Sequence, residues 1–413
     1  MKMKDSGIEW IGQIPEDWDT CKIQSMYSVR NTKVSDIDYP PLSVTKQGVV
    51  PQLDTAAKTD DHNNRKLVKK GDFAINSRSD RRGSCGISEY DGSVSLINTV
   101  LKPNKEDCHE YYDMVFHTVL FADEFYRQGH GIVDDLWTTN WQDMKKISVP
   151  HPDTKTQEKI ANYLNNACSK IDAVSADIQE QIRVLEEYKK SVISETVTKG
   201  LDKSVPMKDS GIDWIGEIPQ DWIIEPVYVH FGERKHLNSF GLEQNLLSLS
   251  YGNIIRKDIN TVGGLLPASF NTYNIVEAND IIIRPTDLQN DMRSLRTGLV
   301  NEHGIITSAY IALKPMSDIN VRFAHYQLHV YDLMKVFYNM GNGVRQGLNY
   351  SEFSKLKLVL PRILIQNQIA DYLDEQCSKI DSMIATKREQ LDVLNRYKQS
   401  IIYEYVTGNK EVV

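Results

Sequence analysis

The sequence predicts an α+β protein with two globular mixed α/β domains in a pseudo-twofold tandem repeat, separated by two long helices that form an antiparallel coiled coil. Two internal repeats support this prediction. The segment from Gln157 to Thr198 returns without a gap as Gln366 to Thr407, and the segment from Met3 to Trp18 returns as Met207 to Trp222. The regions between the repeats show almost no alignable identity with each other. A constant frame therefore carries two diverged inserts.

In both long segments the apolar residues recur at alternating steps of three and four, which is typical of a helix that packs along a narrow seam. Neither segment contains Pro or Gly, so each can form one helix of roughly 60 Å at 1.5 Å per residue. We expect the two copies to pair with each other. Because periodicity alone does not identify the partner, two separate helices packed on their own domains remain the alternative. The expected seam residues are Ile171, Val174, Ile178, Leu185, Tyr188, Val192, Ile380, Met383, Leu391, Leu394, Tyr397 and Ile401.

The shorter repeat reads MKDSGIEWIGQIPEDW at the start of the first half and MKDSGIDWIGEIPQDW at the start of the second. Its tryptophans are expected to be buried against their own domain. The diverged inserts combine short β-branched segments with one helical stretch each. We expect strands at 42–50, 73–76, 94–100, 281–283 and 305–313, and helices at 111–128 and 323–339.

These patterns divide the chain into four parts. Residues 1–155 form the first tag and domain, and residues 156–200 form the first long helix. Residues 201–364 form a linker, the repeated tag and the second domain. Residues 365–413 form the second long helix and a tail.

Composition narrows the functional class. The chain of 413 residues has a net charge of -8 and a pI near 5.7, which argues against a protein that holds nucleic acid by itself. Basic residues nevertheless gather between Arg65 and Arg82, where a solvated loop is the plainer interpretation. The sequence lacks a long apolar run and a signal-peptide core, and its five cysteines lack metal-ligand spacing. We therefore expect a cytoplasmic protein with reduced thiols.

We find no convincing catalytic motif. There is no Asn/Asp-Pro-Pro-aromatic tetrapeptide of the kind that holds a flipped base in an amino-methyltransferase, and no Gly-rich turn for a nucleotide cofactor. His325 and His329 are spaced by four, but the zinc-binding His-Glu-x-x-His pattern is absent. The sequence thus predicts neither an enzyme, nor a bound cofactor, nor a metal.

Three motifs closely resemble the DNA-specificity (S) subunit of type I restriction-modification systems. They are SGIEWIGQIPEDW in the tag, QEKIANYLNNACSKID at the start of the first long segment, and RQGLNYSEFSKLKLVLP before the second. The resemblance covers both halves. It implies a non-catalytic subunit of a prokaryotic cytoplasmic complex, in which each insert is a target recognition domain that reads one half of a split double-stranded DNA site. It further implies that two methyltransferase (M) subunits dock on the frame to methylate adenine at N6, and that restriction (R) subunits join them. S-adenosylmethionine, ATP and Mg are then expected on those partners and not on this chain.

Side chains that read duplex DNA must present donors and acceptors to base edges or phosphates, and the polar loops supply them. In the first half the expected DNA contacts are Lys69, Lys70, Asn76, Ser77, Arg78, Arg81, Arg82, Thr138, Thr139 and Asn140. In the second half they are Arg284, Thr286, Asp287, Gln289, Arg293, Arg296, Asn342, Arg345, Gln346, Asn349 and Tyr350. The alternatives are a two-domain scaffold that binds protein or RNA and a fused DNA methyltransferase or nuclease.

Overall fold

A computed structural model describes residues 2–53, 61–104, 107–131, 137–260, 267, 269–286, 288, 295–340 and 347–412. The chain forms two compact units. Unit 1 comprises Met1–Gln179 and Arg388–Val413, and unit 2 comprises Glu180–Lys387. Across the described residues, none of the helices has the length and apolar character needed to cross a membrane.

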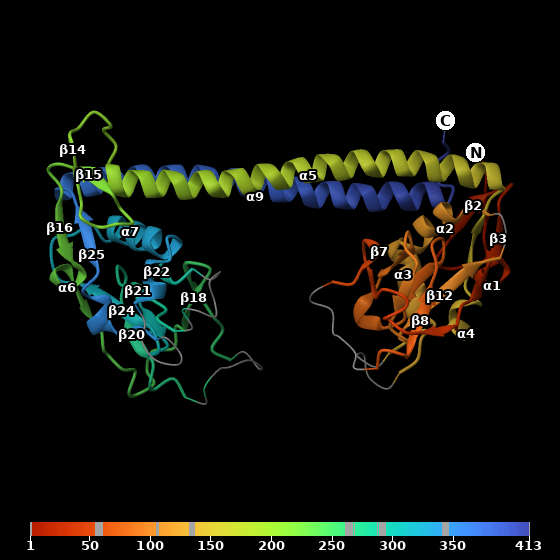
Figure 1. The fold of residues 1–413 in the computed structure, drawn as a ribbon, viewed down its shortest axis with the longest axis horizontal. Coiled ribbons are helices and arrows are strands. Elements are labelled where there is room, and N and C mark those ends of the chain that lie inside the picture. Colours follow the sequence, from red (N-terminus) through yellow and green to blue (C-terminus); the bar gives the residue numbers. More distant parts are fainter. Residues whose placement is uncertain are drawn as a thin grey trace. The chain divides into compact units, whose positions relative to one another are not determined.

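Unit 1 is built on a four-stranded antiparallel sheet with the order β10-β9-β12-β4. Figure 1 labels one of its central strands, β12. A three-stranded sheet, β11-β8-β5, the hairpins β1-β2 and β6-β7, and the two-stranded sheet β13-β3 complete the unit. Its strands are β1 (Met3–Asp5), β2 (Gln13–Pro15), β3 (Asp19–Lys22), β4 (Tyr27–Val29), β5 (Lys33–Val34), β6 (Leu42–Thr45), β7 (Gly48–Pro51), β8 (Arg65–Val68), β9 (Phe73–Asn76), β10 (Cys85–Ile87), β11 (Gly92–Val94), β12 (Asn98–Pro103) and β13 (Ser148–His151). Its shorter helices are α1 (Ile23–Met26), η1 (Ser79–Arg81), α2 (His109–Phe116), α3 (Val119–Arg127) and α4 (Trp141–Met144).

Unit 2 repeats this topology. Its main sheet has the order β17-β24-β21-β22, in which each strand takes the place of β4, β12, β9 and β10, respectively. Its strands are β14 (Met207–Asp209), β15 (Glu217–Pro219), β16 (Ile223–Pro226), β17 (Phe231–Glu233), β18 (Leu247–Ser250), β19 (Asn253–Arg256), β20 (Asn274–Val276), β21 (Ile281–Ile283), β22 (Thr297–Leu299), β23 (Gly304–Ile306), β24 (Ile311–Pro315) and β25 (Lys357–Leu360). Its shorter helices are α6 (Val227–His230), α7 (Val321–Leu333), η3 (Val336–Asn339) and α8 (Tyr350–Phe353). Two inserts without alignable identity thus share one fold.

Several segments predicted as single elements are divided by a turn or a cap. The expected strand at 42–50 is the hairpin β6-β7, and the segment 305–313 contains the ends of β23 and β24. The expected helix at 111–128 is broken between α2 and α3, where the Thr118 hydroxyl accepts a hydrogen bond from the Phe121 amide and caps α3. An uninterrupted pattern of apolar residues indicates that a segment is buried, but it does not indicate where the chain turns.

The long helices α5 (Thr154–Lys199) and α9 (Ile363–Val406) pack antiparallel. In unit 1 the Lys398 Nζ lies 2.6 Å from the Asp172 carboxylate, and in unit 2 the Lys189 Nζ lies 2.7 Å from the Asp381 carboxylate. Moving forward along α5 from 172 to 189 therefore means moving backward along α9 from 398 to 381. The predicted antiparallel pairing of the two repeats is confirmed.

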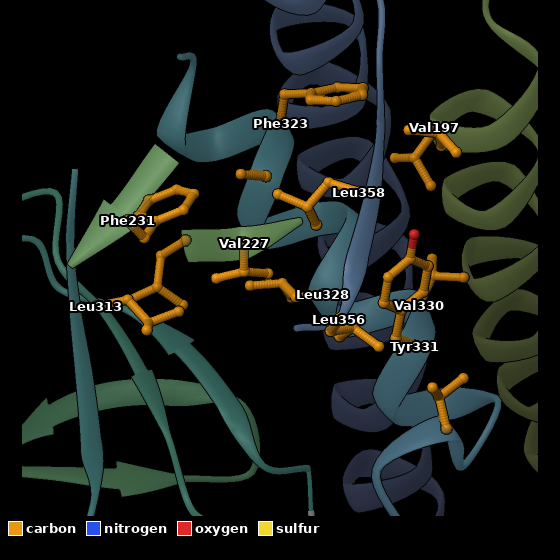
Figure 2. Close-up of a cluster of buried hydrophobic side chains, with 14 of the residues drawn as sticks. Val197, Val227, Phe231, Leu313, Phe323, Leu328, Val330, Tyr331, Leu356 and Leu358 are labelled. Carbon is orange, nitrogen blue, oxygen red and sulfur yellow. The ribbon is translucent and has the colours of Figure 1, made fainter. Parts of the chain in front are cut away.

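The ends of these helices also belong to the domain cores. The alternative prediction, in which the long helices pack on the domains, is correct to this extent. In unit 1 the core takes up Ile160 and Leu164 from the start of α5 and Val406 from the end of α9. In unit 2 it takes up Ile369 from the start of α9 and Val197 from the end of α5. Figure 2 shows Val197 beside the side chains of α7 and β25. The helix pair is thus continuous with both cores.

The predicted seam is only partly buried. Ile171, Ile178, Ile380 and Ile401 are buried, and Leu185, Val192, Leu391 and Leu394 are half-buried. The assignment of the other four to the seam is wrong, because Val174, Tyr188, Met383 and Tyr397 are 47%, 54%, 45% and 55% exposed. The seam instead uses neighbours such as Ile193 and Ile384, which are 2% and 6% exposed. One residue along a helix rotates a side chain by about 100°, so a stripe chosen one position away faces solvent.

A buried glutamine fastens each domain to the helix that follows it. The Gln157 side chain accepts a hydrogen bond from the Cys108 amide at 3.0 Å, and Cys108 is the N-cap residue of α2. The repeat-equivalent Gln366 accepts one from the Asn320 amide at 3.0 Å, and Asn320 caps α7. Each glutamine also donates to a carbonyl in the loop before its own long helix, at 2.8 Å. The same joint therefore holds both diverged domains.

Candidate nucleic-acid interface

In unit 1 the candidate interface is the turn that follows β9. The Asn76 side chain accepts a hydrogen bond from the Arg78 amide at 3.1 Å, and the Ser77 hydroxyl lies 3.1 Å from that of Thr99. These bonds hold the backbone, and Arg78, Arg81 and Arg82 remain exposed. Three guanidinium groups on one short turn form a surface that suits phosphate or guanine.

Arg82 is held in place by two neighbours from α3. Its Nη1 lies 2.8 Å from the Asp123 carboxylate, and its guanidinium carbon lies 3.8 Å from the centre of the Tyr126 ring. Arg81 lies within 3.4 Å of Asp80, with both side chains largely exposed. The turn thus combines one oriented arginine with others that are less constrained.

Residues 138 and 139 lie beside this turn. Arg78 and Thr138 form an isolated antiparallel bridge, and the Thr139 amide donates to the Ser77 carbonyl at 2.9 Å. A pocket at this junction, lined by Asn76, Ser77, Arg78, Arg82, Tyr126 and Thr139 among others, has a volume of about 10 Å³. That is room for about one water molecule, so this pocket cannot hold a flipped base.

Several predicted contacts have structural roles instead. Thr139 is 1% exposed, and its hydroxyl donates to the Phe125 carbonyl at 2.7 Å, so its assignment to the DNA surface is wrong. Asn140 is exposed, but its side-chain oxygen caps α4 by accepting from the Gln142 amide. Asn349 forms a capping box with Glu352 at the start of α8. The Asn-x-x-Asp and Asn-x-x-Glu spacing was the signal for these caps.

The basic run between Arg65 and Arg82 does not form one surface. Arg65 is buried and donates to Ser93, and the Lys66 ammonium donates to the Asn98 carbonyl. Lys69 and Lys70 are exposed but precede β9, whereas Arg78 follows it, so the strand separates them by roughly 13 Å. Lys70 also lies 3.3 Å from Glu89.

In unit 2 the equivalent turn follows β21. Arg284 and Thr286 are half-buried there. Tyr350 is half-buried as well, and its hydroxyl donates to the Phe231 carbonyl at 2.7 Å. The remaining predicted contacts lie outside the described residues: Asp287, Gln289, Arg293, Asn342, Arg345 and Gln346.

Arg296 was expected to contact DNA, and that expectation is wrong because the residue is 0% exposed. Its Nη1 donates to the Thr286 carbonyl at 2.5 Å, and its Nε donates to the Tyr338 hydroxyl at 3.1 Å. The Arg296 carbonyl in turn accepts from the Arg284 amide at 2.8 Å. Arg296 therefore holds the turn after β21 through hydrogen bonds to its backbone. Nothing in its local sequence distinguishes it from an exposed loop arginine.

Two histidines on α7 have strongly perturbed acidities. Burial is the largest cause for both: the pKa of His325 falls to about 3, with His329 adding repulsion, and the pKa of His329 falls to about 4, with Lys189 and Lys190 adding to the effect. The His325 Nε2 is shielded from solvent and unbonded within the described structure. Among the described residues, no group of three or more His, Cys, Asp or Glu side chains could hold a metal ion.

We expect unit 2 to lose stability as the pH falls from 7 to 5. The unfolded histidines take up protons near pH 6.5, while the folded ones stay neutral until about pH 4 and 3. The unfolded state then binds more protons, so the free energy of unfolding should drop by on the order of 3–4 kcal/mol. Urea denaturation at both pH values measures the drop. A His325→Asn, His329→Gln variant should lose most of this dependence, and an unchanged slope would refute the assignment.

The comparisons with known proteins cover the chain from end to end. No family model matches it. A Methanocaldococcus jannaschii chain named as the MjaX specificity subunit of a type I restriction enzyme is 24% identical over 97% of this chain and 96% of its own length. The MjaVIII specificity subunit of the same organism is 23% identical over 97% and 94%.

A solved structure shares the fold. It comes from work on complex assembly and conformational transition of the type I R-M system, and it matches with a TM-score of 0.70 at 13% identity, covering 96% of this chain and 99% of its own. Along nearly its whole length this chain is therefore similar to specificity subunits of type I restriction-modification systems, and it shares the fold of the structure solved from such a system.

Proposed function

We propose that each unit reads one half of a bipartite double-stranded DNA site and that α5 and α9 set the gap between the halves. The observation that carries this proposal is that equivalent strands present different side chains. The end of β9 and the turn after it carry Asn76, Ser77 and Arg78, whereas the turn after β21 carries Arg284 and Thr286. A fold shared by both units, with different polar residues at equivalent places, is what two readers of different sequences require.

In this proposal the recognition domains are residues 1–155 and 201–364. Exposed arginines such as Arg78 and Arg82 contact bases or phosphates, and Lys69 and Lys70 contact phosphates only, which position the protein without reading sequence. Because the chain has a net charge of -8, it binds DNA weakly alone and gains affinity from its partners. Binding of the complex falls steeply with salt. The site of action is the prokaryotic cytoplasm.

We propose that M subunits dock on the outward faces of α5 and α9. Exposed apolar residues recur there at repeat-equivalent positions, and on each helix they lie within an arc of roughly 80° at 100° per residue. An exposed apolar stripe on a helix pair is a surface for further helices. The residues are Tyr163, Val174, Val184 and Tyr188 on α5 and Tyr372, Met383, Val393 and Tyr397 on α9. They include the four residues that do not reach the seam.

Each unit carries half of each stripe, so each offers one docking surface. Unit 1 contributes Tyr163 and Val174 with Val393 and Tyr397, and the Tyr163 ring lies 4.5 Å from that of Tyr405. Two surfaces accommodate two M subunits, which supply adenine N6 methylation and bind S-adenosylmethionine. R subunits, which use ATP and Mg, join through the M subunits.

Substituting one surface should remove one M subunit. We expect Val393→Ser with Tyr397→Ser to weaken docking on unit 1 at least about tenfold, because two apolar contacts of about 1 kcal/mol or more each are lost. Val184→Ser with Tyr188→Ser should do the same on unit 2, and the quadruple variant should bind none. Native mass spectrometry of the purified complex counts the subunits. Val119→Ser on α3, exposed but outside the stripe, is the control, and full occupancy in the quadruple variant would disprove the surface.

The experiment that tests the proposed function is a map of N6-methyladenine in a host that expresses this chain with its M subunits. The expected result is one motif made of two short blocks with a fixed unread gap, lost when the chain is omitted. A continuous motif, or methylation that does not depend on this chain, would exclude the proposal.

A further inference from the structure

The hairpin β18-β19 of unit 2 ends in a turn whose first residue is unusual. Ser250 pairs with Asn253, so Tyr251 and Gly252 form a two-residue turn with φ angles of 46° and 81°. Positive φ at both positions is typical of a type I′ turn, which strongly favours Asn-Gly. A bulky side chain in the left-handed region is strained. The chain thus keeps a tyrosine where asparagine would be more stable.

This tyrosine is also exposed. Its residue surface is 82% accessible, and within the described part of the chain its side chain has neither a hydrogen bond nor a ring contact. A strained position occupied by a side chain that packs on nothing points to a role outside the folding of the domain. Strain alone would not say what that role is.

The hairpin is rigidly anchored next to the proposed reading turn. Leu249 and Ile254 cover Gly298 on β22 so closely that a Cβ there would lie 2.6 and 2.9 Å from their Cδ1 atoms. At the tip, a Cβ on Gly252 would lie 3.0 Å from the Leu295 Cδ1. The carbonyl of the next residue, Arg296, accepts the hydrogen bond from the Arg284 amide. Tyr251 is therefore held beside the turn that carries Arg284 and Thr286.

We infer that Tyr251 is a wedge that stacks into a base step of the half-site read by unit 2. The inference rests on the proposed function. An aromatic ring on a rigid tip can enter a step and be read through the deformability of the DNA sequence, which gives specificity without base hydrogen bonds. Because the backbone of the hairpin tip is held in place before binding, only the Tyr251 side chain has to be ordered when DNA arrives.

The equivalent hairpin of unit 1 does not carry an aromatic residue at its tip. This hairpin, β6-β7, pairs Thr45 with Gly48 and places Lys46 and Gln47 at the tip. The two half-sites should therefore differ: the one read by unit 2 is distorted at a base step, and the other is not. The molecule provides its own internal control.

The test uses the complete complex with its M subunits and a duplex that carries the mapped bipartite site. 2-Aminopurine replaces one base at a time in each half-site. The wild-type complex should raise its fluorescence at one step in the half-site of unit 2 only. Tyr251→Asn should abolish that signal and weaken binding roughly 10- to 100-fold, while raising the melting temperature by about 2 °C as the strain is relieved. Tyr251→Phe should restore both signal and affinity.

Tyr228→Ala, which removes another exposed tyrosine of unit 2 on α6, is the matched control and should bind normally. The inference is overturned if Tyr251→Asn binds DNA as tightly as the wild type, if it loses M subunits instead of DNA, or if the wild type produces no fluorescence change at any step. A wild-type complex without a bipartite site would instead refute the proposed function, so the two failures are distinguishable.

Discussion

Arg296→Ala is expected to destabilise the domain of unit 2 by about 3–5 kcal/mol. The guanidinium is fully buried and donates to the Thr286 carbonyl and the Tyr338 hydroxyl. Its removal takes this donor from the Thr286 carbonyl in a site closed to water, leaves the Tyr338 hydroxyl with the Lys335 ammonium as a donor, and opens a cavity. The backbone amide of Arg296 also donates to the buried carboxylate of Asp332, at 2.5 Å, so the backbone around the cavity is itself restrained. Arg296→Lys should recover little, because an ammonium cannot reproduce the planar fork.

Chemical denaturation of the full chain measures the effect, with the transition of unit 1 as the internal reference. Arg82→Ala is the matched control: it removes an exposed arginine with one ion pair and one ring contact, and should cost about 1 kcal/mol or less. If Arg296→Ala left stability unchanged but abolished DNA binding, the residue would be a direct reader, as its sequence context suggested.

The frame of repeated tags and long helices could be predicted because the two halves of one sequence can be compared with each other. The two long repeats align without a gap, so their shared length and apolar period predict the pairing of α5 with α9. The face of each helix was harder to predict. Ile384 and Met383 are both apolar neighbours, and only packing in three dimensions decides that the isoleucine is buried and the methionine exposed.

The shared sheet order of the two inserts could not be predicted, because alternating apolar residues are compatible with many strand pairings. Nor could the site be predicted in detail. Polarity correctly singled out Arg78, Arg81 and Arg82 as exposed, but the same criterion selected Thr139 and Arg296, which are buried and satisfied by backbone partners. The polarity of a loop residue does not show whether its side chain faces solvent or is buried in hydrogen bonds to the backbone of the loop. Tyr251 was missed because the feature that distinguishes it, a positive φ angle, is visible only in the structure.

A four-residue helical insertion in both long helices is expected to lengthen the gap of the recognised site by one or two base pairs. Gln181 and Lys387 face each other across the pair, so insertions between Gln181 and Ile182 and between Thr386 and Lys387 preserve the seam on either side. Four residues add about 6 Å along the helices, and base pairs are stacked about 3.4 Å apart. The extra rotation of roughly 40° can be taken up by a slight change of supercoil.

Mapping methylated adenines for the doubly inserted chain measures the new gap, and both sequence blocks should stay unchanged because neither domain is altered. The control carries the insertion in α5 alone. It shifts one helix against the other by a turn and separates Asp172 from Lys398 or Lys189 from Asp381. We expect that variant to lose methylation rather than change its gap, since a slipped seam exposes buried isoleucines. If the doubly inserted chain methylated the original gap, the helices could not be the element that measures it, and the spacing would have to be set by the M subunits.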